Sequence, residues 1–403
     1  MKNFFQNRNL LIGMLFTVVA MILGTGQLLI QRTLTANSES VTWGPTFEVD
    51  PLWPKPLPNH WVLGAIIGVA VDDRDHVWIV HRDSTLNAGE IEASTDPQVA
   101  IDCCIPAPPV LEFDQAGNLI QAWGGPGDDY QWPEANHGIS IDYKGNVWIG
   151  SSGAEDAQVL KFTRDGTFLL QVGSPGQSTG NHDMSNFSRP TKIFVDPRAN
   201  EAYVADGYGN RRIVVIDADT GEFKRYWGGY GNVPDESEAV RYDPTGPPAK
   251  QFGSITSKAV HCAELSNDGL LYVCDRKNNR IQVFRPDGTF VQEMFIERQT
   301  LGSGAVWDIA FSRDADQKYL FVADGTNEKV YIVERKPLEM VSSFGDGGRQ
   351  PGQFYGTHSI ATDTFGNVYT TETFEGKRLQ KFIYKGMGTI QTPHQGVLWP
   401  RGN

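Results

Sequence analysis

Three of the eight histidines recur at one position of a repeated sequence pattern. His137, His261 and His358 each stand eight residues before the glycine of a tight turn, in HGISIDYKG, HCAELSNDG and HSIATDTFG. Neutral imidazoles suit Zn²⁺, and three of them leave a fourth coordination position open for water or substrate. The alternative is three unrelated histidines bonded to neighbouring backbone groups, and the shared spacing argues against it. The pattern therefore predicts a catalytic metal site.

Two arginines and a tyrosine follow a second strand of the same repeats. Arg82 and Arg276 end equivalent strands, in VHRDS and CDRKNNR, and Tyr208 stands one residue further along in VADGYGNRR. Arginine can hold a carboxylate through two parallel N–H donors, and a tyrosine near a cation can act as a base. The structural alternatives are salt bridges to Asp83 or Asp275, and packing of the tyrosine between its two flanking glycines.

Short strands in a repeated order must position these residues. A turn residue, two or three β-forming residues and a small or acidic residue recur six times, as DHVWIVHR, GNVWIGSS, NEAYVADG, GLLYVCDR, KYLFVADG and GNVYTTE. Two more strand-like stretches follow each copy, which is typical of a four-stranded propeller blade. We therefore predict an all-β fold, a six-bladed β-propeller of NHL-like repeats over residues 62–386, preceded by an N-terminal hydrophobic segment.

Blade geometry makes the three histidines converge. They begin the innermost strands of the second, fourth and sixth blades, about 120° apart around the axis of a six-bladed ring. The equivalent positions of the other three blades hold Ile67, Thr191 and Trp307. Three long irregular segments fall on the face from which the histidine strands start, namely residues 83–109, 174–190 and 232–256. Long loops on one face of a rigid scaffold indicate that binding takes place there.

The chain outside the blades divides into three segments. Residues 10–30 form an apolar run long enough to cross a bilayer, so we expect residues 1–36 to be a signal peptide or a membrane anchor. Residues 37–61 form a linker with a strand-like stretch at 41–50, which we expect to close the ring by joining the last blade. Residues 387–403 form a C-terminal tail. The propeller is then exported, either secreted or periplasmic or anchored to the membrane outside the cytoplasm.

The four cysteines suit an exported protein, in which disulfides persist. Cys262 and Cys274 flank the turn SNDG on two adjacent strands, so that a cross-strand disulfide is expected. Cys103 and Cys104 are adjacent in a proline-rich loop, where they either form a vicinal ring or remain thiols. No CxxC spacing indicates a metal site, so we interpret all four as structural.

Charge restricts the class of partner. Lys and Arg total 35 against 48 for Asp and Glu, which gives a formal net charge of −13. Such a surface repels phosphate backbones, and no basic stripe reverses this locally, so nucleic-acid binding is excluded. The expected partner is a small molecule or a peptide that bears a carboxylate, bound by a monomer.

Together these residues carry a family resemblance. VHRDS, the three registered histidines, FVDPRANEAYVADGYGNRRIVVID and YVCDRKNNRIQVF resemble peptidyl-α-hydroxyglycine α-amidating lyase (peptidylamidoglycolate lyase) over nearly all of residues 62–386. The resemblance implies a six-bladed propeller that acts as a carbon–nitrogen lyase, with zinc on the three histidines. Tyr208 would take the proton of the α-hydroxyglycine hydroxyl, the C–N bond would break to an amide and glyoxylate, and Arg82 and Arg276 would steady the carboxylate or the developing charge.

The resemblance also implies a structural calcium, held partly by backbone carbonyls. The matching positions are Val69 and Ile139, each two residues after the histidine register. Ser359 stands where better-known members carry a carboxylate after the last zinc histidine, which weakens the calcium prediction. The family's prolines before the histidines are absent, with Asn136, Val260 and Thr357 in their places. The family's disulfide cysteines have no counterparts at matching positions.

Two other functions remain open at this level. A lactonase-like propeller hydrolase or lyase is one, although such sites mix carboxylates and asparagine around calcium rather than imidazoles. A non-enzymatic NHL-repeat scaffold that binds a protein at the cell surface is the other. A scaffold of that kind needs neither the histidine register nor the matched arginines.

Overall fold

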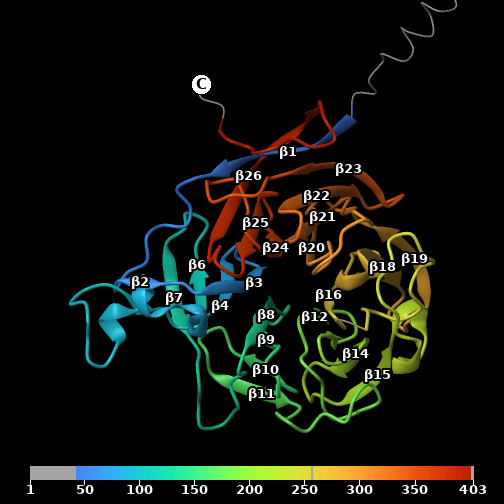
Figure 1. The fold of residues 1–403 in the computed structure, drawn as a ribbon, viewed down its shortest axis with the longest axis horizontal. Helices are drawn as coiled ribbons and strands as arrows, with labels where there is room; N and C mark the ends of the chain where they lie inside the picture. Colours follow the sequence, from blue (N-terminus) through green and yellow to red (C-terminus); the bar gives the residue numbers. More distant parts are fainter. Residues whose placement is uncertain (1–41, 256, 401–403) are drawn as a thin grey trace, which may run out of the picture. The chain divides into compact units, whose positions relative to one another are not determined.

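The computed structural model describes residues 42–255 and 257–400, which form six four-stranded sheets around a central axis (Figure 1). The chain divides into two units, residues 1–43 and 44–403, and of the first unit only Thr42 and Trp43 are described. The expected signal peptide or anchor at residues 1–36 lies outside the described residues. Within the described ranges, no helix is both long and apolar enough to span a membrane.

Each of the first three blades runs outward from the axis in chain order. The first comprises β3 (Ala65–Val71), β4 (Val77–Arg82), β6 (Val110–Phe113) and β7 (Leu119–Trp123). The second comprises β8 (Asn136–Ile141), β9 (Val147–Ser151), β10 (Val159–Phe162) and β11 (Phe168–Val172). The third comprises β12 (Ile193–Asp196), β13 (Glu201–Asp206), β14 (Arg212–Asp217) and β15 (Phe223–Trp227).

The remaining blades follow the same order, except that the last is completed by the start of the chain. The fourth comprises β16 (Val260–Leu265), β17 (Leu271–Asp275), β18 (Arg280–Phe284) and β19 (Phe290–Phe295). The fifth comprises β20 (Asp308–Phe311), β21 (Tyr319–Asp324), β22 (Lys329–Glu334) and β23 (Glu339–Phe344). The sixth comprises β24 (Thr357–Thr362), β25 (Val368–Glu372), β26 (Leu379–Ile390) and β1 (Thr42–Asp50).

The loops contain a small parallel pair and short 3-10 helices. Strands β2 (Trp61–Val62) and β5 (Ile105–Pro106) pair with each other. The 3-10 helices are η1 (Asp83–Thr85), η2 (Ala88–Glu90), η3 (Glu92–Ser94), η4 (Gly229–Gly231), η5 (Glu236–Glu238) and η6 (Arg276–Asn278). The first three lie in the long loop between β4 and β6, so this irregular segment is folded rather than extended.

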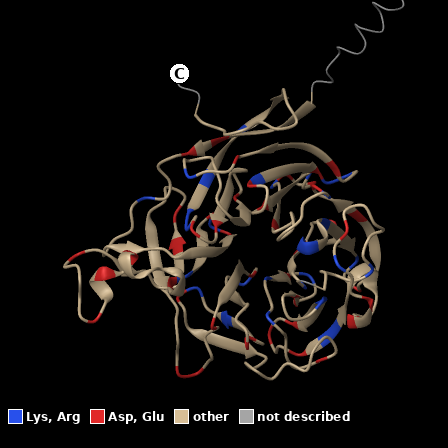
Figure 2. Cartoon of the chain, in the orientation of Figure 1, with Lys and Arg blue, Asp and Glu red and all other residues tan. Residues whose placement is uncertain are grey.

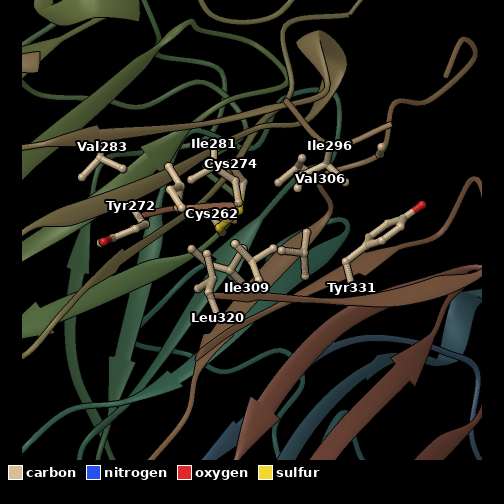
Figure 3. Close-up of a cluster of buried hydrophobic side chains, with 14 of the residues drawn as sticks. Cys262, Tyr272, Cys274, Ile281, Val283, Ile296, Val306, Ile309, Leu320 and Tyr331 are labelled. Carbon is tan, nitrogen blue, oxygen red and sulfur yellow. A yellow bond between two sulfur atoms is a disulfide. The ribbon is translucent and has the colours of Figure 1, made fainter. Parts of the chain in front are cut away.

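The core lies between neighbouring blades, and strand alternation explains why. In β17, Tyr272 and Cys274 face a cluster shared with the fifth blade, whereas Leu271 and Val273 face a cluster shared with the third. A middle strand therefore buries both of its faces, which requires the nearly continuous apolar sequence LYVC. Figure 3 shows Tyr272 and Cys274 among Ile309 and Leu320 of the next blade.

Three tight turns on the face away from the histidines, in the first, second and sixth blades, are each built around one aspartate. Asp142 accepts hydrogen bonds from the backbone N–H groups of Lys144 and Asn146, and Trp148 Nε1 donates to its other oxygen. The turn glycine Gly145 has φ +79°, a left-handed conformation that glycine adopts without steric cost. Asp72 and Asp363 repeat this arrangement. The recurring turn, Asn and aromatic residues of the sequence pattern are thus explained by this network.

Strand β1 is the outer strand of the sixth blade, beside β26, at the ring-closing position that the sequence indicates. Phe47 of β1 packs its ring 5.7 Å from that of Phe344, in the fifth blade. Strand β26 extends to Ile390, so the regular structure continues past the boundary that the sequence analysis places at residue 386. Proline at position 45 is tolerated because β1 is an edge strand.

The four cysteines form two disulfides. Cys262 and Cys274 face each other in the register of β16 and β17, with Cα atoms 4.9 Å apart (Figure 3). Cys103 is joined to Cys104 in the loop between β4 and β6, so the vicinal pair is bonded rather than free. Acidic and basic residues are interspersed along the chain around the ring (Figure 2).

His81 anchors the start of that loop in its neutral form. Its Nδ1 accepts from the N–H of Gly64, and its Nε2 contacts the carbonyl oxygen of Pro108 at 3.0 Å. Burial lowers the pKa of His81 to about 4, although hydrogen bonds to the loop act in the opposite sense. Because the unfolded chain takes up this proton near pH 6.5, the stabilisation is present above that pH and is lost as the pH falls towards 4.

We therefore expect the free energy of unfolding to fall by about 2 kcal/mol between pH 7 and pH 5 through His81 alone. Urea unfolding at the two pH values, with zinc present throughout, measures this difference. His81→Gln should reduce the pH dependence by that amount, whereas His60→Gln, at an exposed position, should leave it unchanged. An equal pH dependence in all three proteins would contradict the assignment.

Candidate functional site

The three registered histidines meet at the axis. Each is the second residue of an innermost strand, His137 in β8, His261 in β16 and His358 in β24. Their ring centroids are 4.9 Å apart in all three pairs. One nitrogen from each lies within 4.8 Å of the others, and all three side chains are buried. The shared position of the three histidines in alternate blades therefore brings together three potential metal ligands.

The other three blades orient these rings. His137 Nδ1 lies 3.1 Å from the carbonyl oxygen of Thr191, and His261 Nδ1 contacts the carbonyl oxygen of Trp307. The backbone of Ile67, the third residue of that register, lies near His358 and acts to raise the pKa of that histidine. Among the described residues, no hydrogen bond to His358 Nδ1 is formed. A backbone acceptor at Nδ1 fixes the proton there and leaves the Nε2 lone pair for a metal.

The environment suits a metal ion. His137 Nε2 is buried and has no hydrogen-bond partner among the described residues, which is costly unless a ligand is bound. Burial holds the pKa of all three histidines well below the usual value, and neighbouring positive charges add to this. Neutral imidazoles with free nitrogens are the form that binds zinc, so the donor set fits this ion.

Tyr208 lies beside this cluster, in the turn after β13. Its hydroxyl is 3.1 Å from Nε2 of His261 and accepts a hydrogen bond of 2.9 Å from Nη1 of Arg276. The flanking glycines make this placement possible, because a Cβ at Gly207 would lie 2.1 Å from the Val260 carbonyl oxygen. A Cβ at Gly209 would lie 2.0 Å from Ser188 Oγ. Side chains larger than glycine at positions 207 and 209 would therefore displace the turn that directs Tyr208 towards the histidines.

The two predicted arginines flank the histidines without carboxylate partners. Arg82 donates to the Asn136 carbonyl and to Ser152 Oγ, at 2.8 and 2.6 Å. Arg276 stacks on Trp307, with 4.4 Å between its guanidinium carbon and the ring centroid. Asp275, the structural alternative for Arg276, is paired with Arg280 instead, at 2.7 Å. Within the described residues, no carboxylate oxygen lies within 4 Å of either guanidinium, so both can receive an anionic ligand.

Arg189 adds a third guanidinium group beside Arg82 and Arg276, and it was not identified from the sequence. The Arg189 guanidinium lies 5.4 Å from the Tyr208 ring centroid, and its Nε donates to the Ser152 carbonyl oxygen. Arg189 ends the long loop before β12, outside the repeated strand pattern, so no register pointed to it.

A cleft leads away from Tyr208 on the same face. It has a volume of about 1260 Å³ and is lined by residues 178–182 of one long loop and residues 232–238 of another. Gly209, next to Tyr208, is one of its lining residues. These loops belong to two of the irregular segments that the sequence places on this face, and the cleft is large enough for a peptide segment or a sizeable acyl group.

The residues predicted to hold calcium do not fit that ion. Val69 and Ile139 line an axial cavity of about 260 Å³, but Lys192 lines it too. The Lys192 ammonium is bonded to Glu264 and Asp308, which are the carboxylates a cation would need. The hydroxyl of Ser359 donates to Asp308 at 2.6 Å, so it is also engaged.

Comparison with known proteins finds one repeat profile and several relatives. The profile of the NHL repeat matches residues 261–284, the segment that contains His261 and Arg276. Peptidylglycine alpha-amidating monooxygenase of Rattus norvegicus is 28% identical over 299 residues, covering 72% of this chain and 27% of that protein. The chain thus spans about a quarter of the length of this relative.

Two further relatives and one solved structure are similar. A probable peptidyl-alpha-hydroxyglycine alpha-amidating lyase of Caenorhabditis elegans is 25% identical over 152 residues, 37% of this chain and 36% of that protein. NHL repeat-containing protein 3 of Mus musculus is 26% identical over 325 residues, 78% of this chain and 74% of that protein. A structure of unknown function from Bacteroides thetaiotaomicron has a TM-score of 0.52 at 12% identity, covers 85% of this chain and 77% of that chain, and supports the fold alone.

Fold, repeat and relatives thus lead to one conclusion. The sheets form a six-bladed propeller, the repeat profile covers part of the fourth blade, and the relatives include named amidating enzymes. This chain is a six-bladed β-propeller in which one segment matches the NHL repeat, and it is similar to amidating enzymes that include a probable peptidyl-α-hydroxyglycine α-amidating lyase.

Proposed function

We propose that this protein is a zinc-dependent lyase that converts an N-acyl-α-hydroxyglycine, such as a peptidyl-α-hydroxyglycine, into an amide and glyoxylate. The observation that carries the proposal is the contact of the Tyr208 hydroxyl with both His261 and Arg276, beside three histidines with neutral rings. This places a proton acceptor, a positive charge and a metal-ligand set within a few ångströms of one another.

The reaction needs one proton moved and one bond broken. Tyr208 takes the proton from the hydroxyl oxygen, the electron pair left on that oxygen forms the aldehyde carbonyl, and the C–N bond breaks. The amide nitrogen receives the proton, which gives the free amide and glyoxylate with atoms balanced. Zinc held by His137, His261 and His358 would supply Lewis-acid polarisation of a substrate oxygen. Arg276 Nη1 donates a hydrogen bond to the same hydroxyl, so a positive charge lies beside the proposed base.

The three arginines account for the choice of substrate. Guanidinium groups bind carboxylates through charge-assisted, paired hydrogen bonds, and an α-hydroxyglycine presents a carboxylate next to the reacting carbon. Arg82 is held against Ser152 and Asn136, so one face of the guanidinium is fixed while the other remains available. The acyl or peptide portion would extend into the cleft beyond Gly209.

Arg82→Ala is expected to raise the KM for carboxylate-bearing substrates by about 10- to 100-fold, because hydrogen bonds to charged groups are worth about 1.5–3 kcal/mol. Steady-state kinetics with an α-hydroxyglycine and with its carboxamide analogue measure this, since only the acid should lose affinity. Arg276→Ala should lower kcat as well, because it also removes the donor to Tyr208. Arg198→Ala, an exposed position at a turn on the opposite face, is the control. Equal losses for acid and amide substrates would contradict the role of Arg82.

The proposal is tested by measuring metal content and glyoxylate release on the same purified protein. One zinc per chain and formation of equal amounts of amide and glyoxylate support it. Zinc without glyoxylate from any α-hydroxyglycine compound would overturn the substrate class and leave a metal site of another enzyme. We further propose that the propeller is exported, and its two disulfides support this because such bonds persist in oxidising compartments.

A further inference from the structure

A buried ammonium group lies on the axis of the ring. Lys192, which follows the register position Thr191, places its Nζ 2.8 Å from Oε1 of Glu264 and 2.8 Å from Oδ1 of Asp308. Its side chain is 8% exposed. Burial alone would lower the pKa of Lys192, but the charges of Asp308 and Glu264 raise it above the usual value. The group is therefore a permanent cation at neutral pH.

Hydrogen bonds continue from this cation across the ring. Asp308 of the fifth blade accepts from Ser359 Oγ of the sixth at 2.6 Å, and Ser359 Oγ accepts from the N–H of Val69 in the first at 3.2 Å. With Lys192 in the third blade and Glu264 in the fourth, the network joins five of the six blades. Ile139, from the remaining blade, lines the same cavity.

We propose that Lys192 is a built-in cation that replaces the structural calcium implied by the family resemblance, so that this protein folds and holds its zinc without calcium. The inference rests on that resemblance and on the axial contacts, and it does not depend on the proposed reaction.

Two physical arguments support the replacement. Calcium takes six to eight oxygen ligands, and here both nearby carboxylates already bind the ammonium. Ser359 stands where the better-known members carry a carboxylate, and its hydroxyl is already bonded to Asp308. A divalent ion in the same cavity would also stand within a few ångströms of a positive charge, where repulsion is only weakly screened. The lysine thus provides the charge that joins the blades at the axis, and it already binds both Glu264 and Asp308.

The test is calcium binding and thermal unfolding of the full, zinc-loaded protein. The wild type should bind no calcium in equilibrium dialysis at millimolar concentration, and added calcium should shift its Tm by less than about 1 °C. Lys192→Met should lower the Tm by about 5–10 °C, because it leaves two carboxylates without their cation. Millimolar calcium should restore part of that loss in the variant only.

Lys161→Met is the matched control, since Lys161 is also buried and its Nζ lies 3.9 Å from Asp142 and 3.7 Å from Asp219, but it donates to the Ala218 carbonyl away from the axis. It should lose stability without becoming calcium-sensitive. One calcium bound per wild-type chain, with a rise in Tm that Glu264→Gln and Asp308→Asn abolish, would overturn the proposal. If Lys192→Met does not fold, the wild-type titration decides the question by itself. Because neither measurement involves glyoxylate, failure here is distinct from failure of the proposed lyase activity.

Discussion

Replacing any one of the axial histidines by alanine is expected to remove both the zinc and nearly all glyoxylate release. A two-histidine remnant loses a direct ligand, and since even outer partners of metal ligands are worth 10- to 100-fold in affinity, a loss of at least about 100-fold is expected. Metal content after dialysis and initial rates on the same samples measure the two effects. His137→Ala tests the ring whose Nε2 is buried without a partner among the described groups.

The control for this experiment is a histidine outside the cluster. His60→Ala removes an exposed imidazole and should change neither zinc content nor rate. Circular dichroism should report an intact β fold for all variants, because the blades are held together by apolar clusters and not by the histidines alone. A His137→Ala protein that keeps stoichiometric zinc and full activity would place the metal elsewhere and remove the basis of the proposed mechanism.

Tyr208→Phe is expected to separate metal binding from turnover. The variant keeps the aromatic ring between its glycines but loses the hydroxyl that contacts His261 and Arg276. Loss of a general base typically costs 10²–10⁴-fold, so kcat should fall by about that factor while zinc content stays at the wild-type value. Glyoxylate release and metal analysis on one preparation measure both quantities.

A second tyrosine variant makes the result specific. Tyr143→Phe removes a hydroxyl that bonds Asn200 at a turn on the opposite face, and it should be silent in both assays. Full glyoxylate-forming activity in Tyr208→Phe would show that another group takes the proton. A fall in kcat together with loss of zinc would instead make the tyrosine a positioning residue for His261.

The repeated part of the site could be predicted from the sequence, and the non-repeated part could not. The three histidines share a register, so the symmetry of the ring alone indicates that they converge. Arg82 is the last residue of β4, and Arg276 occupies the equivalent position of its blade, directly after β17. The hydrogen bond between Arg276 and Tyr208 joins two blades through turn conformations, including φ +53° at Tyr208, which residue type alone does not specify.

Arg189 and Lys192 illustrate the limit in two ways. Arg189 belongs to a long loop whose path depends on its own contacts, so no periodic pattern indicates that it reaches Tyr208. Lys192 is one residue past a register position and could be placed near the axis, but its partners lie in two other blades. Val69 and Ile139, where the family resemblance implies calcium, line the same cavity as Lys192, a side chain that the resemblance does not indicate.

Closure of the sixth blade ties the two ends of the propeller together, and this has a consequence for how the chain folds. Thr46 Oγ of β1 donates to the carbonyl oxygen of Gly386 across a separation of 340 residues. During synthesis β1 is made first, and its partner strand β26 is made only when the last blade is synthesised. Contacts so distant in sequence are slow to form, because a very long loop must close before they contribute. Completion of the ring is therefore a late event, and removal of either end should leave an open arc with an exposed, aggregation-prone edge.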